Sequence, residues 1–573
     1  MVRRVRSVAL ICAVSGLVLA QSTAHAQVIA PSQFTPQSLR PETRPNASPL
    51  NVRGPSAITM PAGDNHLTVL ISRLDVEGAF AELASAAGKF QDHIVGRRVS
   101  VAEIYQAAAD LEQIYLAAGY PLVRVVVPPQ KLVDQGRLRF VVVDGFIEAI
   151  DVDRVPSRVR RSVAARAYVL LGQRHLKLAA IERAVLVASA VSGLRLRSML
   201  ERGNQDGGVR LILEGEHRLV SGGVAIDDRL PGNLGTWQWR GSVALNSAFG
   251  AGEQIYAMAG SGMNLAAASE GRSPLAIYGG GVVVPLGTDG LTINPEYTHS
   301  VTVTNQRADV PASLGDYDRV ALRLRMPIEL TRKTSLYANF SLEGIDQELK
   351  APDFGVMLNH DRYGAFRAGP DCATILPWGA GVQVGALASF GLGGRSALDG
   401  AESGIPLSRI GASPDFAKFN LTAHLSQPMA AGLRLDLATA GQFTGGTPMM
   451  RPEQISLDGS DALSAFPFGT FNADQGVTLR GELSRPYVFG AGAFNLTASP
   501  YVFGAAGRGW LANATRIEQA AFDAATIGVG IRGGVDTAGW PSATVGLEIA
   551  RGFTDLAGVR QGVRINLVAA TAF

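Results

Sequence analysis

Apolar and polar side chains alternate with a period of two through most of the chain beyond residue 216. In the stretch 236–249, for example, Trp237 and Leu245 fall on one face, and Arg240 falls on the other. The same alternation recurs, between glycine-rich or polar turns, in 320–329, 418–425 and 433–437. A period of two is that of a β-strand with one apolar and one polar face. The pattern therefore predicts a long succession of strands.

The distribution of side chains indicates which kind of β-protein these strands form. The polar face carries Arg323, Arg325 and Glu329 in mid-strand, aromatic residues stand at strand ends, and the last strand ends on Phe573. A watery interior and a lipid-facing exterior with aromatic girdles produce such a pattern. At roughly 20 to 24 residues per strand, residues 217–573 predict an all-β transmembrane barrel of about 16 antiparallel strands. A barrel of this size encloses an aqueous channel.

The preceding 150 residues predict two small α+β modules. In the first, 68–146, a strand at 69–76 precedes a helix that opens on the capping box of Ser100 and Glu103 and stops at Gly119. Two strands follow, at 122–127 and 137–143. The order of strand, helices and two strands then repeats in 147–216.

Composition and charge identify two further segments at the N-terminus, residues 1–26 and 27–67. Charged residues make up only 18% of the chain, below the roughly 25% of a soluble domain. Residues 1–26 combine three arginines, an apolar run and the small-residue site Ala24-His25-Ala26, which is typical of a secretory signal peptide. Residues 27–67 hold seven prolines, which favour an extended tether. The chain after the expected cleavage has 49 basic and 49 acidic residues, so its charge gives no reason to expect a nucleic-acid partner.

Candidate chemistry is sparse. Gly528-x-Gly530-x-x-Gly533 matches a dinucleotide fingerprint only by letter, because no helix follows it. The eight histidines are scattered, 359–362 is expected to be a solvated loop, and Cys372 alone remains after cleavage. We therefore expect no enzymatic activity, no cofactor and no metal site.

The order of these regions resembles the TpsB transporters of two-partner secretion, which share a superfamily with the barrel-assembly insertases. The first module resembles a POTRA domain through Gly119-Tyr120, Gln130, Gly136 and Val142-Val143-Asp144-Gly145. The second resembles another POTRA domain through Leu171-Gly172, Ile181-Glu182-Arg183 and Gly193.

The resemblance implies an outer-membrane protein, embedded in lipid, whose periplasmic POTRA domains receive the N-terminal secretion domain of a large exoprotein. The barrel then secretes that exoprotein unfolded. Exposed strand edges are the expected docking sites, with the candidate residues Leu122, Arg124, Val125, Arg195 and Arg197.

The family's long inward-folding loop is altered in this chain. Asp474-Gln475-Gly476 and Leu479-Arg480-Gly481-Glu482-Leu483 match the segments that follow the loop tip. This alignment places Ser464, Ala465 and Phe466 at the tip, with serine where the family has arginine. The arginine's usual aspartate partner corresponds to Ala505, between Phe503 and Gly507. Because loss of both members of a buried ion pair is close to neutral, we expect Phe466 packing and nearby polar contacts to hold the loop.

One alternative alignment stays open at this stage. It makes Leu479-Arg480-Gly481 the loop tip, but leaves Asp474-Gln475-Gly476 without a role. A structure with Arg480 at the lumen centre, paired with a carboxylate, would overturn the first placement. The family also has an N-terminal helix that threads the pore. The prolines of 27–67 predict no stable plug, so deletion of this tether should leave the conductance unchanged.

Three other functions compete with exoprotein secretion. An assembly insertase usually carries more POTRA repeats than 150 residues allow. A passive porin has no need of two folded modules. A degenerate, inactive transporter is the third alternative, suggested by the altered loop.

Overall fold

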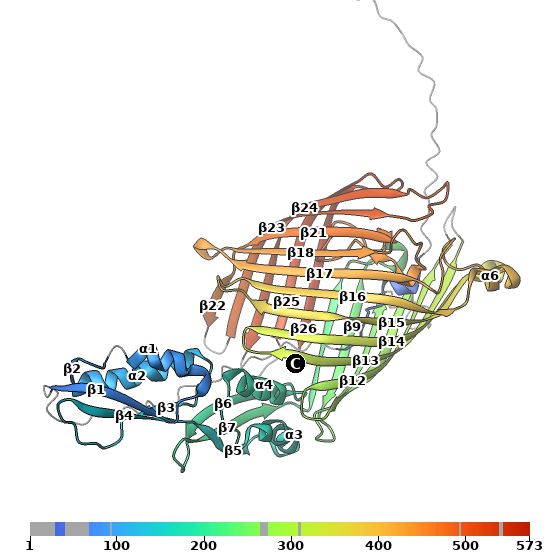
Figure 1. Cartoon of the computed structure of the whole chain (residues 1–573). Helices are drawn as coiled ribbons and strands as arrows, with labels where there is room; N and C mark the ends of the chain where they lie inside the picture. Colours follow the sequence, from blue (N-terminus) through green and yellow to red (C-terminus); the bar gives the residue numbers. More distant parts are fainter. Residues whose placement is uncertain are drawn as a thin grey trace, which may run out of the picture.

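The computed structural model describes residues 29–40, 68–91, 94–263, 273–306, 311–491, 494–537 and 542–573. The expected signal peptide and tether residues 27–28 and 41–67 lie outside the described residues. The described chain comprises two small modules beside one end of a barrel (Figure 1). None of the described helices is both long and apolar enough to cross a bilayer.

The first module packs its helices on a four-stranded sheet with the order β2-β1-β4-β3. Its elements are β1 (Thr68–Glu77), η2 (Ala81–Leu83), α1 (Ala84–Gln91), β2 (Arg98–Ser100), α2 (Val101–Ala117), β3 (Arg124–Val126) and β4 (Gly136–Val143). The predicted capping box is confirmed, because Ser100 Oγ accepts from the Glu103 N–H while the Glu103 carboxylate accepts from the Ser100 N–H. Tyr115 and Phe140 are fully buried between α2 and the sheet.

The second module has a three-stranded sheet with the order β5-β7-β6. Its elements are β5 (Phe146–Arg154), α3 (Ser157–Ala167), η3 (Tyr168–Leu170), α4 (Leu178–Ser189), β6 (Leu194–Arg202) and β7 (Gly208–His217). Leu122, from the first module's sequence, packs into the second module's core. Gly145 permits this junction, because a Cβ there would overlap the carbonyl group of Leu122.

All but two of the remaining described strands close into one antiparallel barrel, and β19 (Ile455–Ser456) and β20 (Asn472–Ala473) pair with each other in the connection 444–474. The first eleven strands of the barrel are β8 (Val220–Asp227), β9 (Gln238–Asn246), β10 (Gln254–Gly262), β11 (Leu275–Leu286), β12 (Leu291–Thr304), β13 (Ser313–Leu330), β14 (Thr334–Ala351), β15 (Val356–Ile375), β16 (Gly381–Gly394), β17 (Ala417–Pro428) and β18 (Arg434–Phe443). The others are β21 (Gln475–Ser484), β22 (Tyr487–Ala491), β23 (Phe494–Trp510), β24 (Ala521–Thr537), β25 (Ser542–Thr554) and β26 (Gly562–Ala572), which pairs with β8.

β21 and β22 are two parts of one wall strand. Both pair with β23 in a single register, in which Ser484 faces Tyr501 and Tyr487 faces Ala498. The break falls at Arg485-Pro486, where proline has no N–H to give to the ladder. Counted this way, the barrel has 16 strands, and the predicted fold class is confirmed.

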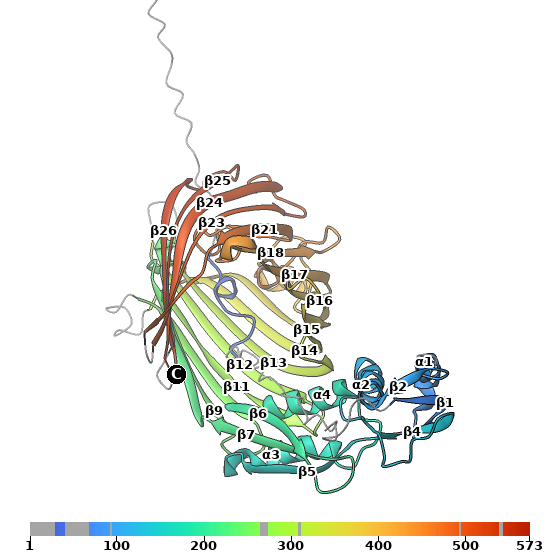
Figure 2. The same ribbon diagram turned by 90° about the vertical axis from the view of Figure 1, so that its left-hand side faces the viewer.

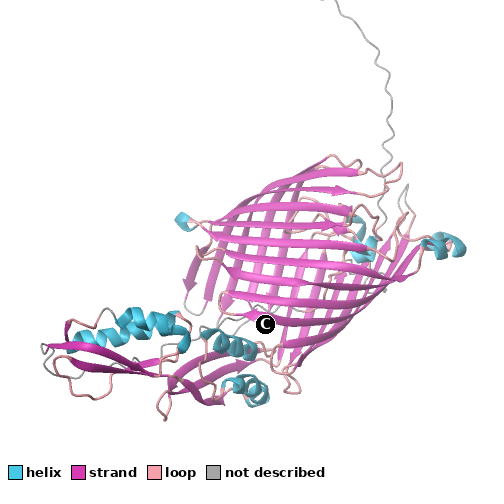
Figure 3. Cartoon of the chain, viewed as in Figure 1, coloured by secondary structure: helices cyan, strands magenta, loops and turns pink. Residues whose placement is uncertain are grey.

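The two faces of the wall differ as the alternation predicts. On β13, Val320 and Leu322 are exposed on the outer face, whereas Arg319 is buried on the inner face. The helices of the two modules gather at one end of the barrel, and α6 (Ala397–Ser403) lies at the other (Figure 3). Two segments other than strands lie inside the ring of strands, residues 29–40 and the connection 444–474 (Figure 2).

The first of these segments corrects the expectation that the tether places no plug in the pore. Residues 29–40, here called the N-terminal lumen segment, lie inside the barrel with Ala30 and Leu39 buried. Within residues 29–40 no α-helix forms, as the prolines predict, and one 3-10 turn is present, η1 (Pro31–Gln33). They do not exclude a non-helical segment whose backbone groups bind to wall side chains.

A second correction concerns residues 359–362. They lie within β15 rather than in a loop, and the Asp361 side chain is fully buried. One of its oxygens accepts from the Ser408 N–H at 2.8 Å. The dinucleotide-like glycines 528–533, in contrast, lie within β24, as the strand interpretation predicted.

The second module is hydrogen-bonded to the barrel rim. Arg183 of α4 donates to the carbonyls of Pro327 and Ile328 at 3.0 Å each. Glu182 pairs with Arg332, in the turn after β13, at 2.5 Å. The hairpin ends at this rim therefore face the modules, and the ends near α6 face away from them.

Candidate functional site

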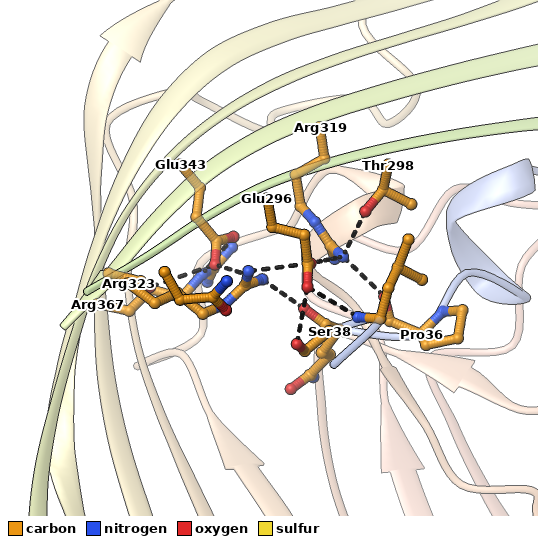
Figure 4. Close-up of polar contacts among 12 residues, drawn as sticks. Pro36, Ser38, Glu296, Thr298, Arg319, Arg323, Glu343 and Arg367 are labelled. Atoms are coloured by element: carbon orange, nitrogen blue, oxygen red, sulfur yellow. Dashed lines mark hydrogen bonds and ion pairs between the residues drawn. The ribbon is translucent and has the colours of Figure 1, made fainter. Parts of the chain in front are cut away.

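The N-terminal lumen segment lies along β12 and β13, and most of its polar contacts involve its main chain. Arg319 Nη2 donates to the Pro36 carbonyl at 2.9 Å, and Arg323 Nη2 donates to the Gln37 carbonyl at 2.6 Å (Figure 4). The Leu39 N–H donates to Glu296 Oε2 at 2.9 Å. These wall groups thus bind both main-chain acceptors and a main-chain donor.

The direction of the segment follows from its two ends. Pro31 packs against Gly315 at the start of β13, where a Cβ would stand 2.6 Å from the proline Cδ. Leu39 packs against Tyr256 and Val283, nearer the rim that faces the modules. The segment therefore has its N-terminal end toward the far mouth of the barrel.

Glu296 is the centre of the wall groups that bind the segment. Its side chain is fully buried and pairs with Arg323 at 2.9 Å and Arg319 at 3.3 Å. The Tyr256 hydroxyl donates to it at 2.7 Å, and Arg319 also donates to Thr298 at 3.1 Å. A carboxylate with this many donors is satisfied in a buried site.

A row of charges connects these groups to the second segment inside the barrel. Arg323 lies 3.6 Å from Glu343, and Glu343 lies 3.1 Å from Arg367. Arg367 then pairs with Glu453 at 2.7 Å. Glu453 belongs to the connection 444–474 between β18 and β21, here called the lumen loop.

The lumen loop begins and ends on buried charges. Burial opposes ionisation of Glu453, but Arg367 and Lys418 outweigh it, so the pKa of this carboxyl lies below its ordinary value. At the loop's other end Asp474 is fully buried and pairs with Arg409 at 3.2 Å. The Met449 N–H also donates to Asp474 at 3.0 Å, which ties the start of the loop to its end.

Between these ends the loop builds an apolar core against the wall. Phe466 and Phe471 meet edge to face with ring centroids 4.7 Å apart, and Phe471 stacks on Phe522 of β24 at 5.5 Å. Gly552 of β25 leaves the space for Phe466, because a Cβ there would overlap its ring. Aromatic packing of this kind fixes one position of the loop.

The predicted loop-tip residue Ser464 lies between two charged wall residues. Its hydroxyl donates to Glu548 of β25 and accepts from Arg480 Nη1 of β21 at 2.9 Å. Arg480 and Glu548 pair directly at 2.8 Å, and Asn566 donates to the Ser464 carbonyl at 2.9 Å. A small hydroxyl thus fits into a buried ion pair that belongs entirely to the wall.

The structure brings the predicted tip and its predicted strand partner together. Ala465 and Phe466 share one core with Phe503 and Ala505, and the Arg480 guanidinium lies 3.6 Å from the centre of the Phe503 ring. The tip's Leu463 packs over Gly507, where a Cβ would stand 3.3 Å from it. Gly476 similarly leaves space for Leu457 of the loop, at 3.0 Å.

Arg480 meets the criterion stated for the alternative alignment only in part, because it is buried and paired with the Glu548 carboxylate but does not stand at the lumen centre. It does so from wall strand β21, directly opposite Ala505 in the register, and not from a loop. Ala505, at the position where the family has aspartate, therefore offers no carboxylate to Arg480, and Glu548 supplies one instead.

The predicted docking residues of the first module are placed unequally. Leu122 and Val125 are buried, so their side chains are not presented at a surface. β3 is an edge strand, but the Val125 N–H donates to Glu112 of α2 at 3.1 Å, and Arg124 lies 3.4 Å from the same carboxylate. Glu112 therefore covers part of this edge.

The second module presents a longer edge. β6 spans nine residues and pairs only with β7 in the described part of the chain. Arg195 and Arg197 are exposed on one face, whereas Leu194 and Leu196 are buried on the other. This edge is the more accessible of the two predicted ones.

Two groups of metal-ligating side chains form across strands although their sequence positions are far apart. One comprises His299, Asp316 and Asp318, and the other Asp346, Glu348 and His360. They lie on the face of the wall opposite to Tyr317 and Arg319 and are partly exposed. Half-exposed carboxylates of this kind are common without an ion.

Sequence reasoning missed the residues that hold the N-terminal lumen segment. Glu296 and Arg319 stand among alternating strand residues, as Arg323 does, and a charge on the predicted inner face is the only signal they give. The partner role of Glu548 required the register of β21, β23 and β25.

Comparisons with known proteins agree with this architecture. The model of the family "Haemolysin secretion/activation protein ShlB/FhaC/HecB" matches residues 209–533, and that of the ShlB-type POTRA domain matches residues 69–145. CdiB from Escherichia coli is similar in structure, with a TM-score of 0.67 at 17% identity over 95% of each chain. CdiB from Acinetobacter baumannii has a TM-score of 0.59 at 12% identity over 92% of this chain and 95% of its own. No curated protein matches the sequence.

The family match covers more than half of the chain, and the closed barrel with its N-terminal modules agrees with it. The chain therefore belongs to the haemolysin secretion/activation (ShlB/FhaC/HecB) family of two-partner secretion transporters in the bacterial outer membrane, with its POTRA region in the periplasm.

Proposed function

We propose that residues 68–146 and 147–216 are two POTRA domains that capture the N-terminal secretion domain of one large exoprotein. Residues 217–573, embedded in outer-membrane lipid, then export that exoprotein unfolded. Transport is the chain's whole activity in this proposal, and folding of the exoprotein outside the cell drives it.

In this proposal the exoprotein is captured at the exposed edge of β6. An extended segment that adds to β6 gains main-chain hydrogen bonds along a nine-residue edge. Arg195 and Arg197 add positive charge on the exposed face. Because α4 of the same module is bonded to the rim through Arg183, a captured segment is held beside the barrel mouth.

The contents of the barrel support export of an unfolded chain. The lumen loop and the N-terminal lumen segment both lie inside the ring of strands. An extended chain can take the place of one such segment, which is itself a single extended chain. The same contents distinguish this barrel from an open porin.

A secretion assay with the exoprotein encoded beside this transporter tests the capture step. We expect the variant Arg195→Glu/Arg197→Glu to lower secretion at least about tenfold. Reversal of the two charges removes any ion pair that the arginines form with an added strand and repels acidic residues on it. The matched control is Arg137→Glu/Arg139→Glu. These arginines have the same spacing and exposure but lie on β4, where β1 pairs on one side. On the other side the Gln130 side chain already bonds the N–H and the carbonyl of Arg139.

Equal secretion by the two double variants would contradict capture at β6. Loss of secretion in both would indicate damage to the modules, which heat-modifiability of the barrel and protease resistance of the modules would reveal. Assembly of other barrels that depends on this protein, with secretion unchanged, would favour the insertase alternative.

A further inference from the structure

The wall groups that hold the N-terminal lumen segment bind features that every polypeptide has. Pro36 and Gln37 contribute carbonyls to Arg319 and Arg323, and Leu39 contributes its N–H to Glu296. The Ser32 N–H adds a longer bond to Gln347 at 3.3 Å. Because four contacts are made with main-chain groups, this site recognises an extended backbone more than a particular sequence.

The wall makes fewer hydrogen bonds with the side chains of the segment than with its main chain, and these require only small hydroxyl groups. Thr35 meets Ser300 at 2.6 Å through two hydroxyls, and Ser38 donates to Glu296 at 2.9 Å. Leu39 is the one deeply buried apolar side chain at this end of the segment. The site therefore binds a chain that offers main-chain carbonyls at two successive positions. Two positions later, that chain must have an apolar residue with a free N–H.

The same wall groups are bonded to one another without help from the segment. Glu296 is within 3.3 Å of both arginine side chains and accepts from Tyr256. Arg319 is further fixed by Thr298. Groups held in place by their neighbours stay positioned when their ligand leaves, which lowers the cost of binding the next one.

We propose that these residues of β12 and β13, with Tyr256 of β10, form a binding site for the extended main chain of the exoprotein in transit. We call it the β12–β13 site, and it comprises Tyr256, Glu296, Thr298, Ser300, Arg319 and Arg323. The N-terminal lumen segment occupies it in the resting transporter as a substitute for that chain. The inference rests on the proposed export function.

Exchange of one extended chain for another explains how the pore opens without a nucleotide. Each hydrogen bond lost with the departing segment is remade with the arriving chain. The pore stays filled during the exchange, so opening and loading are one event.

A blocking experiment in planar bilayers tests the site directly. The transporter is prepared without residues 29–40, and a synthetic peptide of the sequence Ile29–Arg40 is added on the side of the modules. We expect the peptide to reduce the conductance. A scrambled peptide that keeps the two prolines and Leu39 in place should block within about threefold of the same concentration, because the main chain is unchanged.

Methylation of one amide supplies the decisive comparison. A peptide N-methylated at Leu39 loses the main-chain donor to Glu296, so we expect its half-blocking concentration to rise at least about tenfold. An inactive scrambled peptide, or an unaffected N-methylated one, would overturn main-chain recognition. The first result would leave the segment a sequence-specific stopper.

Wall variants locate the block. Arg323→Gln should raise the half-blocking concentration about tenfold or more, because a charge-assisted hydrogen bond to a carbonyl is lost. The control Arg434→Gln removes an arginine of β18 that pairs with Asp436 at 2.9 Å and should leave the block unchanged. Equal effects of the two variants would place the peptide elsewhere.

The peptide experiment does not use secretion, so the two proposals fail separately. Secretion that proceeds while no peptide blocks would retain export and remove the β12–β13 site. Peptide block in a protein that secretes nothing would retain the site and remove export.

Discussion

The barrel holds two internal segments, and they are held in different ways. The lumen loop is bound by side chains, through the aromatic cluster of Phe466 and the ion pair that encloses Ser464. The N-terminal lumen segment is bound mainly through its backbone by Arg319 and Arg323. Side-chain contacts specify one partner, whereas backbone contacts accept many. The comparison indicates a loop that is part of the wall and a segment that is exchangeable.

The largest expected effect is the loss of stability when the main aromatic side chain of the lumen loop is truncated. Phe466 is buried, so Phe466→Ala removes its packing and should destabilise the closed loop by about 4 kcal/mol. Heat-modifiability should show a lower unfolding temperature of the barrel. Phe354→Ala is the control, because Phe354 is exposed in the hairpin between β14 and β15. Equal temperatures for the two variants would show that the loop is not part of the fold.

The wall ion pair behind Ser464 provides the second test. Glu548→Leu leaves Arg480 buried without its closest carboxylate and should cost about 3 kcal/mol. The double variant Arg480→Leu/Glu548→Leu should recover most of that loss, since an apolar pair leaves no buried charge. The unfolding temperatures of the two variants and the wild type measure the coupling. A double variant less stable than Glu548→Leu would show that Arg480 stabilises the wall through other contacts, such as Glu482 at 3.5 Å.

A side chain placed at Gly315 should release the segment and leave the loop in place. A Cβ there would stand 2.6 Å from Pro31, so Gly315→Val should increase the open fraction in single-channel recordings about tenfold, as expected for the loss of roughly 1.4 kcal/mol. Gly344→Val, where a Cβ meets no atom within 4 Å, is the matched control. An unchanged open fraction in Gly315→Val would show that the segment does not close the pore.

The smallest expected effect is a pH dependence confined to the loop. Burial raises the pKa of Asp458 to about 6, although the Gly469 and Phe471 N–H groups donate to it. The closed loop therefore favours the protonated acid, and this advantage is lost as the pH rises through about 6. Closure should weaken about tenfold from pH 5 to pH 7.5. Loop-opening steps in recordings of the transporter without residues 29–40 measure it, and Asp458→Asn should abolish the dependence.

The fold was predictable because its signals are local. Alternation along a strand such as 320–329 fixes its inner and outer faces without knowledge of its neighbours, and the capping box at Ser100 marks a helix start by itself. The placement of the loop tip at Ser464, which rests on Asp474 and Gly476 following it at a recognisable distance, stays a prediction.

The contacts inside the lumen were not predictable for the opposite reason. Leu39 meets Glu296 across 257 residues of sequence, and nothing near either residue indicates the other. The prolines of 27–67 predicted no helix, which holds for the described residues 29–40, but they gave no information on whether an extended segment finds partners. Residues 359–362 were misassigned because their polar side chains resemble a turn, whereas β15 continues through them.

The N-terminal lumen segment and the first module are parts of one chain, 27 residues apart in sequence. A connection of this length limits their separation to at most about 90 Å, so in the proposed exchange a released segment stays at a high local concentration around the mouth of the barrel. A visiting chain must match that concentration to enter, which is achieved by being held on the modules beforehand. Once the visitor has left, the pore recloses at a rate that does not depend on how many copies of the protein the cell makes.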